Sequence, residues 1–199
     1  MLKKVYKVYK FFIFMAMRDE RQNGKTMMRY TRETALERLL KSYETYYNIH
    51  RFGDEQLPIT ARCDFFEHSQ KYMLSKKAEL WSADCEEFLY LLNIPHLTLP
   101  LYEQWRDYVH KDAMALLHIG PGHMYSFITP VFVCDTCDED ARKALRRCRI
   151  YKSFHFSLHG WMDYHVAVVD LGRSRVDSNR SGHSTAKILK KVLYSQTKR

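Results

Sequence analysis

Residues 151–171, YKSFHFSLHGWMDYHVAVVDL, decide the expected fold because apolar and polar residues alternate along them. Side chains of a β-strand point alternately to its two faces, so the alternation predicts a two-sided β-hairpin. A one-residue slip would turn every side chain to the other face, so the apolar rows fix the register. This register places residues 160–162 in the loop. The apolar row consists of Phe154, Phe156, Leu158, Tyr164, Val166 and Val168.

The opposite face of this hairpin gathers histidines and one carboxylate. In the expected register His159 lies opposite Asp163, and His155 and His165 share their face. Imidazole and carboxylate groups a few ångströms apart can bind zinc or another divalent metal, or act as an acid/base pair. The alternative is a solvent-facing polar row, which antiparallel sheets commonly have.

The rest of the chain predicts an α+β domain. Helices are expected over residues 31–47, 98–118, 135–149 and 184–194, and strands over 59–66, 71–81, 86–92, 124–134 and 175–178, besides the hairpin. The order α-βββ-α-β-α-βββ-α has mostly tight turns between strands. It therefore predicts a largely antiparallel sheet, with a βββ meander, one further strand and a C-terminal hairpin, flanked on one side by about four helices.

Length and composition favour a single domain. With 199 residues, of which 46% are hydrophobic, the chain can form one packed core, and we assign residues 29–199 to it. Residues 1–28 form an extension outside this domain. It is read as an interfacial membrane anchor, as a weak signal sequence or, preferably, as a segment outside a native protein that starts at Met27 or Met28.

Two absences favour a cytoplasmic protein. No run of about 18 apolar residues predicts a transmembrane helix. Five cysteines without a dense framework predict free thiols and a reducing compartment.

The net charge of +9 lies at the two ends of the chain. Residues 1–28 carry +5, residues 171–199 carry +7, and residues 29–170 carry −3. A nucleic-acid-binding protein usually displays its basic residues on the folded surface. Bases on terminal tails therefore weaken that interpretation.

A basic set between the ends offers a candidate anion-binding surface. On an expected short helix, Arg142 lies one turn from Arg146, and Lys143 lies one turn from Arg147. The full set is Arg142, Lys143, Arg146, Arg147, Arg149 and Lys152. Together with the C-terminal bases they could contact phosphates, although a solvated helix face that complements the helix dipole is the favoured interpretation of the set by itself. Our preferred hypothesis is a non-enzymatic binding or accessory domain for an anionic partner, with nucleic acid as one candidate. A protein partner remains if neither nucleic acid nor metal binds.

The enzyme alternatives are a metal-dependent hydrolase at the histidine face and a degenerate nuclease. A helix, three antiparallel strands, a helix and a strand also form the core of PD-(D/E)XK nucleases, which need two acids for Mg²⁺ and a lysine near the attacking water. The candidates here are Asp64, Glu79 and Lys77. Because Lys77 precedes Glu79, the motif is reversed.

A Cys-x-x-Cys pair, Cys134 and Cys137, falls where a strand is expected to end and a helix to begin. A helix N-terminus in this position can stabilise a thiolate. Thioredoxin-like folds also place a later cis-proline beside the dithiol, and no proline follows Pro130. The missing proline argues against a redox-active pair. A zinc site that also includes Cys148 and His155 is a further alternative, and the preferred interpretation is two ordinary cysteines near a buried strand.

Three segments, KSFHFSLHGWMDYHVAVVDL (152–171), YSFITPVFVCD (125–135) and KYMLSKKAELW (71–81), give the chain a resemblance to a small bacterial family known only as a domain of unknown function. The resemblance covers roughly residues 30–195. It implies a bacterial, cytoplasmic, stand-alone domain and supplies no catalytic residue or substrate.

Overall fold

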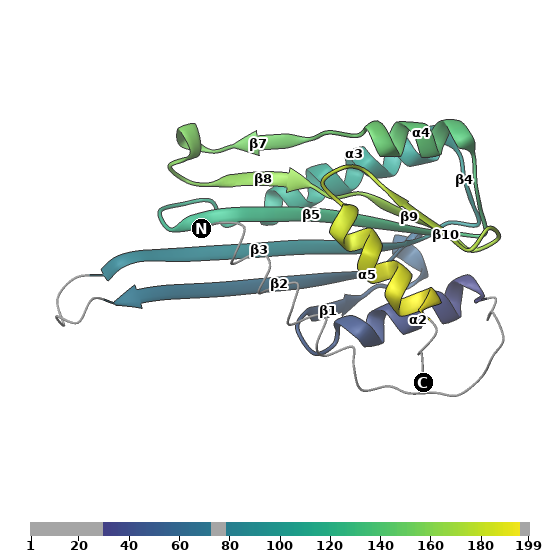
Figure 1. Ribbon diagram of the computed structural model, residues 1–199, viewed down its shortest axis with the longest axis horizontal. Helices are drawn as coiled ribbons and strands as arrows, with labels where there is room; N and C mark the ends of the chain where they lie inside the picture. Colours follow the sequence, from purple (N-terminus) through teal and green to yellow (C-terminus); the bar gives the residue numbers. More distant parts are fainter. Residues whose placement is uncertain (1–29, 73–78, 196–199) are drawn as a thin grey trace.

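One mixed β-sheet lies between two pairs of helices in the computed structural model, which describes residues 30–72 and 79–195 (Figure 1). The expected extension 1–28 and Lys77 lie outside these residues. No helix in the described part of the chain is both long and apolar enough to cross a membrane.

The α+β class and the broad order of elements are confirmed. The described residues form α2 (Arg32–Tyr43), β1 (Asn48–Arg51), β2 (Ile59–Tyr72), β3 (Glu79–Asn93), β4 (His96–Leu97), α3 (Leu99–Leu116), β5 (His123–Cys134), β6 (Thr136–Cys137), α4 (Glu139–Arg147), β7 (Tyr151–Ser153), β8 (Trp161–Tyr164), β9 (Ala167–Asp170), β10 (Arg175–Ser178) and α5 (His183–Tyr194).

Local signals start α2 and α3, whereas α4 begins after Asp138 and not at Asp135, where the expected helix begins. The side-chain oxygen of Thr31 accepts a hydrogen bond from the backbone N–H of Thr34, and Thr98 does the same for Leu101. Pro100 stands in the first turn of α3, where a missing N–H costs nothing. The first helix ends at Tyr43, earlier than expected, and is followed by β1, which sequence analysis missed.

The expected meander exists with different boundaries. Strands β1, β2 and β3 pair antiparallel in succession, and β2 and β3 remain paired from Ile59↔Leu92 to Tyr72↔Glu79. The expected strands 59–66 and 71–81 require a turn between them, but Ser69 pairs with Ala83 within this ladder, so β2 continues through that position. The predicted separate strand over 71–81 is therefore wrong.

Strand β5 lies at the centre of the sheet. It pairs in parallel with β3 on one edge, and with β8 and then β9 on the other. Helices α3 and α4 provide the long connections that parallel pairing requires. The antiparallel pairs, β1–β2, β2–β3, β7–β8 and β9–β10, thus surround a parallel centre.

Helices cover both faces of the sheet, so the expectation of helices on one side is wrong. Val131 of β5 packs in the core formed with α2 and α5, whereas its neighbour Phe132 packs in the core formed with α3 and α4. Both side chains are fully buried. A strand covered on both faces has consecutive apolar residues, and almost the whole of β5 is buried.

The predicted register of the 151–171 hairpin is also wrong. Tyr151 pairs with Asp163 and Ser153 with Trp161, so the loop runs from 154 to 160. The loop backbone turns left-handed, with φ of 45°, 52° and 70° at three consecutive residues; these are His155, Phe156 and Ser157.

Two side chains of the expected apolar row are consequently in solvent, because Phe156 is 101% and Leu158 is 81% exposed. Gly160 is the last residue of this loop and passes close to β5. A Cβ atom there would lie 2.3 Å from the carbonyl oxygen of Met124, so only glycine fits before β8.

The left-handed loop predicts a stabilising substitution. Left-handed φ costs a side-chain-bearing residue roughly 1–2 kcal/mol, and asparagine adopts it more readily than phenylalanine. Because the Phe156 ring is fully exposed, we expect Phe156→Asn to raise the free energy of unfolding by about 0.5–1 kcal/mol. Urea denaturation should show a higher midpoint with an unchanged slope.

Phe156→Ala is the matched control, since it removes the same ring and keeps the backbone cost. We expect it to stay within about 0.5 kcal/mol of the parent protein. A Phe156→Asn variant that is less stable than Phe156→Ala would contradict the assignment of strain to this turn.

Candidate functional site

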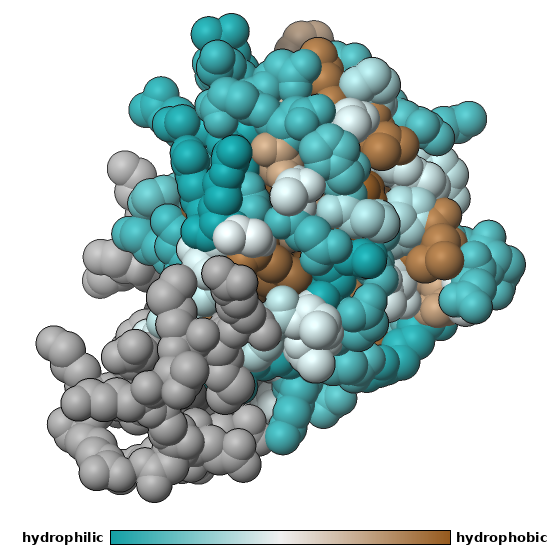
Figure 2. Space-filling model, turned by 90° about the vertical axis from the view of Figure 1, so that its right-hand side faces the viewer, coloured by the Kyte–Doolittle hydropathy of each residue, from teal (hydrophilic) through white to brown (hydrophobic). Residues whose placement is uncertain are grey.

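The candidate site lies at the end of the sheet where the parallel strands β5 and β9 finish. Their last residues, Cys134 and Asp170, are paired in the ladder. Ligands of open sheets with parallel strands commonly bind outside the carboxyl ends of those strands. The surface at this end of the molecule is predominantly hydrophilic (Figure 2).

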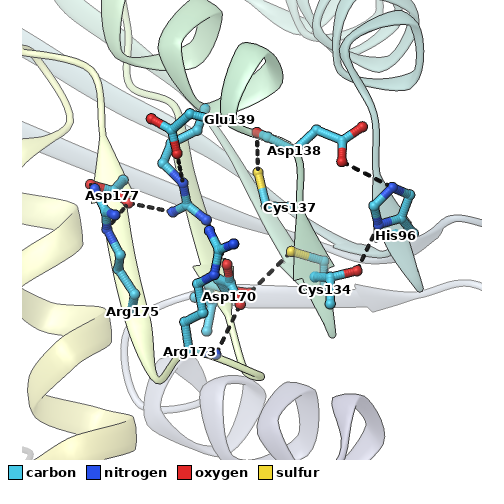
Figure 3. Close-up of polar contacts among 12 residues, drawn as sticks. His96, Cys134, Cys137, Asp138, Glu139, Asp170, Arg173, Arg175 and Asp177 are labelled. Carbon is cyan, nitrogen blue, oxygen red and sulfur yellow. Dashed lines mark hydrogen bonds and ion pairs between the residues drawn. The ribbon is translucent and has the colours of Figure 1, made fainter.

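A fully buried arginine joins three elements beneath this surface. Arg142 of α4 donates from Nη2 to Asp170 of β9 and from Nη1 to Asp177 of β10, each at 2.5 Å. Its Nε lies 3.5 Å from a carboxylate oxygen of Glu139. Figure 3 shows these carboxylates together with the neighbouring arginines of the β9–β10 hairpin.

The prediction that Arg142 binds an external anion is therefore wrong. Its side chain is 0% exposed, and its charge is already compensated by Asp170 and Asp177. Burial alone would lower the pKa of Arg142, but the hydrogen bonds to the two carboxylates outweigh it and raise the pKa. The arginine is a structural cation of the fold.

The same contacts fix the charge of Asp177. Burial alone would raise the pKa of Asp177, but hydrogen bonds from Arg142 and Arg175 outweigh it and lower the pKa. The carboxylate therefore remains ionised and paired at neutral pH. Its negative charge is largely neutralised where β10 reaches the surface.

A basic groove of about 720 Å³ lies between the β9–β10 turn and α5. Five of its side chains are basic, and one, Asp177, is acidic and paired as described. The groove is lined by Arg173, Ser174, Arg175, Val176, Asp177, Lys187, Lys190, Lys191, Tyr194 and Ser195.

Backbone contacts hold the β9–β10 turn that carries Arg173. The N–H of Leu171 donates to the carbonyl of Cys134, and the N–H of Gly172 donates to that of Asp135, both at 2.9 Å. A Cβ atom on Gly172 would lie 2.6 Å from the Asp135 oxygen, so the close approach requires glycine. Arg173 is thus presented by a fixed turn.

The lysines of the groove share one face of α5. Lys187, Lys190 and Lys191 are spaced three and four residues apart, which places them side by side on a helix. The opposite face carries Leu189 and Leu193, which are buried against the sheet. The spacing of the three lysines along the expected helix 184–194 is the signal in the sequence that predicts this basic face.

Tyr194 also lines the groove. Its hydroxyl is buried and has no hydrogen-bond partner among the described residues. Burial, with a smaller effect of the Asp170 carboxylate, raises the pKa of Tyr194 to about 12. The groove therefore contains a neutral, buried hydroxyl beside its cationic side chains.

The other predicted anion-binding residues lie elsewhere. Arg146, Arg149 and Lys152 are exposed, as expected. They belong to or follow α4, which packs on the opposite face of the sheet from α5. The Lys152 ammonium lies 5.7 Å from the centre of the Phe154 ring. These bases therefore form a surface separate from the groove.

The predicted metal site divides into two separate pairs. The rings of His155 and His159 lie 4.5 Å apart in the exposed loop, and His165 lies 3.7 Å from Asp163. His165 is 2% exposed and stacks on Phe127. No group of three or more histidine, cysteine, aspartate or glutamate residues within 30–72 and 79–195 is arranged to hold a metal ion. The predicted face depended on a register that the loop does not adopt.

The predicted nuclease acids do not meet. Asp64 pairs in the ladder with Phe88 and is held by Arg62 at 2.8 Å and His50 at 3.1 Å. Glu79 stands at the start of β3, nine residues before Phe88. At roughly 3.3 Å per residue the backbone positions of Asp64 and Glu79 are about 30 Å apart.

A buried polar network at the other end of the sheet was missed by sequence analysis. Ser126 donates to Glu86 at 2.7 Å, and its oxygen lies 2.6 Å from Nε2 of His123. The backbone N–H of His118 also donates to Glu86. Because Ser126 is fully buried, its hydroxyl joins the acid and the imidazole without facing solvent.

Residues 31–191 match the model of a protein family described as a domain of unknown function (DUF8052). No curated protein matches the chain, and no solved structure matches it. The resemblance noted from the sequence segments is confirmed as membership of a domain-of-unknown-function family.

The buried arginine predicts a large and specific loss of stability. Removing one partner of a buried ion pair leaves an uncompensated charge and typically costs about 3–5 kcal/mol. We expect a loss of this size for Arg142→Met, and a coupling of about 1–3 kcal/mol with Asp170→Asn in a double-mutant cycle. Arg146→Met, an exposed position on the same helix, should change stability by less than about 0.5 kcal/mol. Equal effects of the two arginine substitutions would contradict the assigned role.

The lowered pKa of Asp177 predicts a stability difference that depends on pH. A carboxylate with a lowered pKa stabilises the folded state above its unfolded pKa of about 3.9, and this contribution is lost as the pH falls through the folded pKa. Asp177→Asn should therefore be clearly less stable than the parent at pH 7, and this difference should shrink below about pH 4. Denaturation curves measured across this range test it, with Asp54→Asn, an exposed position, as the control.

Proposed function

Because the chain belongs to this domain-of-unknown-function family, we propose its function from its own geometry. We propose a non-enzymatic binding protein whose anionic partner, a nucleic acid, docks in the groove between the β9–β10 turn and α5. The five free cysteines support a cytoplasmic location as part of this proposal.

The observation that carries the proposal is the set of five bases facing one groove. Lysine and arginine side chains that neutralise phosphates supply most of the affinity of proteins for nucleic acids. The acid in the groove, Asp177, is already paired with Arg142 and Arg175. The groove therefore has a strong excess of positive charge.

The lining favours a polyanion over a small organic ligand. Small-molecule pockets are mostly apolar with a few placed polar groups. Here the bases are spread along α5 and across the β9–β10 turn, and the sole aliphatic side chain of the lining is Val176. A chain of phosphates matches such a distribution better than a single compact ligand.

The enzyme alternatives have less support. The backbone positions of Asp64 and Glu79 are far apart, and the four residues of the histidine face form two pairs. Among the described residues, no histidine, cysteine or acid cluster of three or more is arranged to bind a metal ion. We therefore propose binding without catalysis.

The proposal predicts a salt-dependent affinity that depends on the α5 lysines. Each phosphate contact contributes about 0.9 to the slope of log affinity against log salt for duplex DNA, and about 0.7 for single strands. For Lys187→Gln with Lys190→Gln we expect weaker binding and a slope reduced by about 1.8 on duplex DNA. Fluorescence anisotropy with labelled DNA and RNA, between about 50 and 200 mM salt, measures both quantities.

Arg146→Gln with Arg149→Gln is the charge-matched control on the opposite face of the sheet. This pair should leave the affinity and the slope unchanged. If it weakens binding and the lysine pair does not, the partner docks on α4 and the groove assignment is wrong. Absence of binding to any DNA or RNA at low salt would refute the function itself.

A further inference from the structure

The Cys-x-x-Cys motif lies at the same end of the sheet. Cys134 is the last residue of β5, and Cys137 is the last residue of β6, next to the N-terminus of α4. Both cysteines belong to the same buried cluster, and the Cys137 sulfur lies 3.4 Å from the carbonyl oxygen of Asp138. Figure 3 shows the Cys134 sulfur turned toward β9, where it lies 3.5 Å from the carbonyl oxygen of Val169.

Backbone contacts fix the segment that carries both cysteines. The N–H of Asp135 donates to the carbonyl of Pro95 at 3.1 Å, and the N–H of Asp138 donates to that of Leu97 at 3.0 Å. His96 lies 2.6 Å from the Thr136 hydroxyl. The spacing of the thiols is thus set by the surrounding strands.

The electrostatic surroundings distinguish Cys137 from Cys134. The neighbouring Cys134 thiol lowers the pKa of Cys137; burial opposes this, and the positive charge of Arg142 lowers it further. The neighbouring Cys137 thiol, together with burial, raises the pKa of Cys134.

The two cysteines also differ in their exposed fractions. Cys137 is 5% exposed, whereas Cys134 is 0% exposed. The residues between them, Asp135 and Thr136, are exposed, so the motif lies at the surface. The other three cysteines differ from Cys137, because burial raises the pKa of each; they are Cys63, Cys85 and Cys148.

We propose that Cys134 and Cys137 form a redox-active dithiol that exchanges with small disulfides. The Cys137 thiolate attacks one sulfur of the disulfide, forms a mixed disulfide and releases one thiolate. Cys134 then gives its proton to that released thiolate and attacks the Cys137 sulfur, which expels the second thiolate. The protein gains a Cys134–Cys137 disulfide and loses two electrons, while the small disulfide is reduced to two thiols.

This activity goes beyond the proposed binding function and does not depend on it. The groove uses the bases of α5 and the β9–β10 turn, whereas the dithiol uses the β5–α4 segment. Failure of either can be recognised separately, because one is measured by oligonucleotide affinity and the other by covalent mass.

The test uses the reduced, folded protein of full length and glutathione disulfide. After acid quenching, intact mass should show the loss of two hydrogens, and peptide mapping should place the disulfide between Cys134 and Cys137. Cys134→Ser should instead retain one glutathione on Cys137, because the resolving thiol is gone. Cys137→Ser should completely lose the Cys134–Cys137 disulfide and form no adduct at Cys134.

Cys148→Ser is the matched control, since Cys148 is partly exposed and lies outside the pair. It should form the disulfide as the parent does. The parent measurement needs no variant, so a variant that fails to fold leaves the test intact. A parent protein that keeps both thiols reduced, or that first forms an adduct at Cys148, would overturn the proposal.

Discussion

One buried cation determines the geometry of the functional end of this protein. Arg142 is fully buried and bridges α4 to the last residue of β9 and to β10. Transferring a guanidinium and carboxylates from water costs several kcal/mol per ion, and only close, well-directed contacts offset this cost. Helix α4, the β9–β10 hairpin and the Cys-x-x-Cys segment are therefore held in one arrangement, because any displacement of α4 would leave charges buried without partners. The surface groove and the thiol pair both border this cluster.

The elements with local signals were predictable from the sequence. Thr31 and Thr98 cap their helices as their positions suggested, and the apolar stripe of α5 packs inward. The two-sided cover of the sheet was also readable, because β5 is apolar at consecutive positions rather than at alternate ones. Tight turns between the other strands suggested helices on one side only, but a strand such as β5 needs apolar partners on both faces.

The hairpin register was not predictable from alternation. Alternating residues mark two faces only where the chain stays extended, and here it leaves the ladder after Ser153. The left-handed residues that follow include Phe156, and none of the three is a glycine or asparagine, the residues that would have predicted this conformation. Gly160, which suggested a turn, is needed instead where the chain passes Met124. The predicted histidine site was lost for the same reason, since its four residues shared a face only in the extended register.

The charge counted along the sequence located the basic C-terminal region correctly, but it did not predict which surface these bases form. The excess of +7 in residues 171–199 suggested a basic tail, yet β10 is a strand of the sheet and α5 packs against the sheet. Five bases of this region therefore face one groove on the folded surface. The objection that the bases lie on tails, and so argue against a nucleic-acid partner, does not apply to them. Conversely, the sequence suggested that Arg142 could bind an external anion, whereas in the structure it pairs with the buried Asp170. A count of charges cannot show which bases already have a buried acid as partner. The basic composition of the chain thus favours an anionic partner. Which arginines can contact that partner depends on the fold, because Asp170 and Asp177 already pair with Arg142.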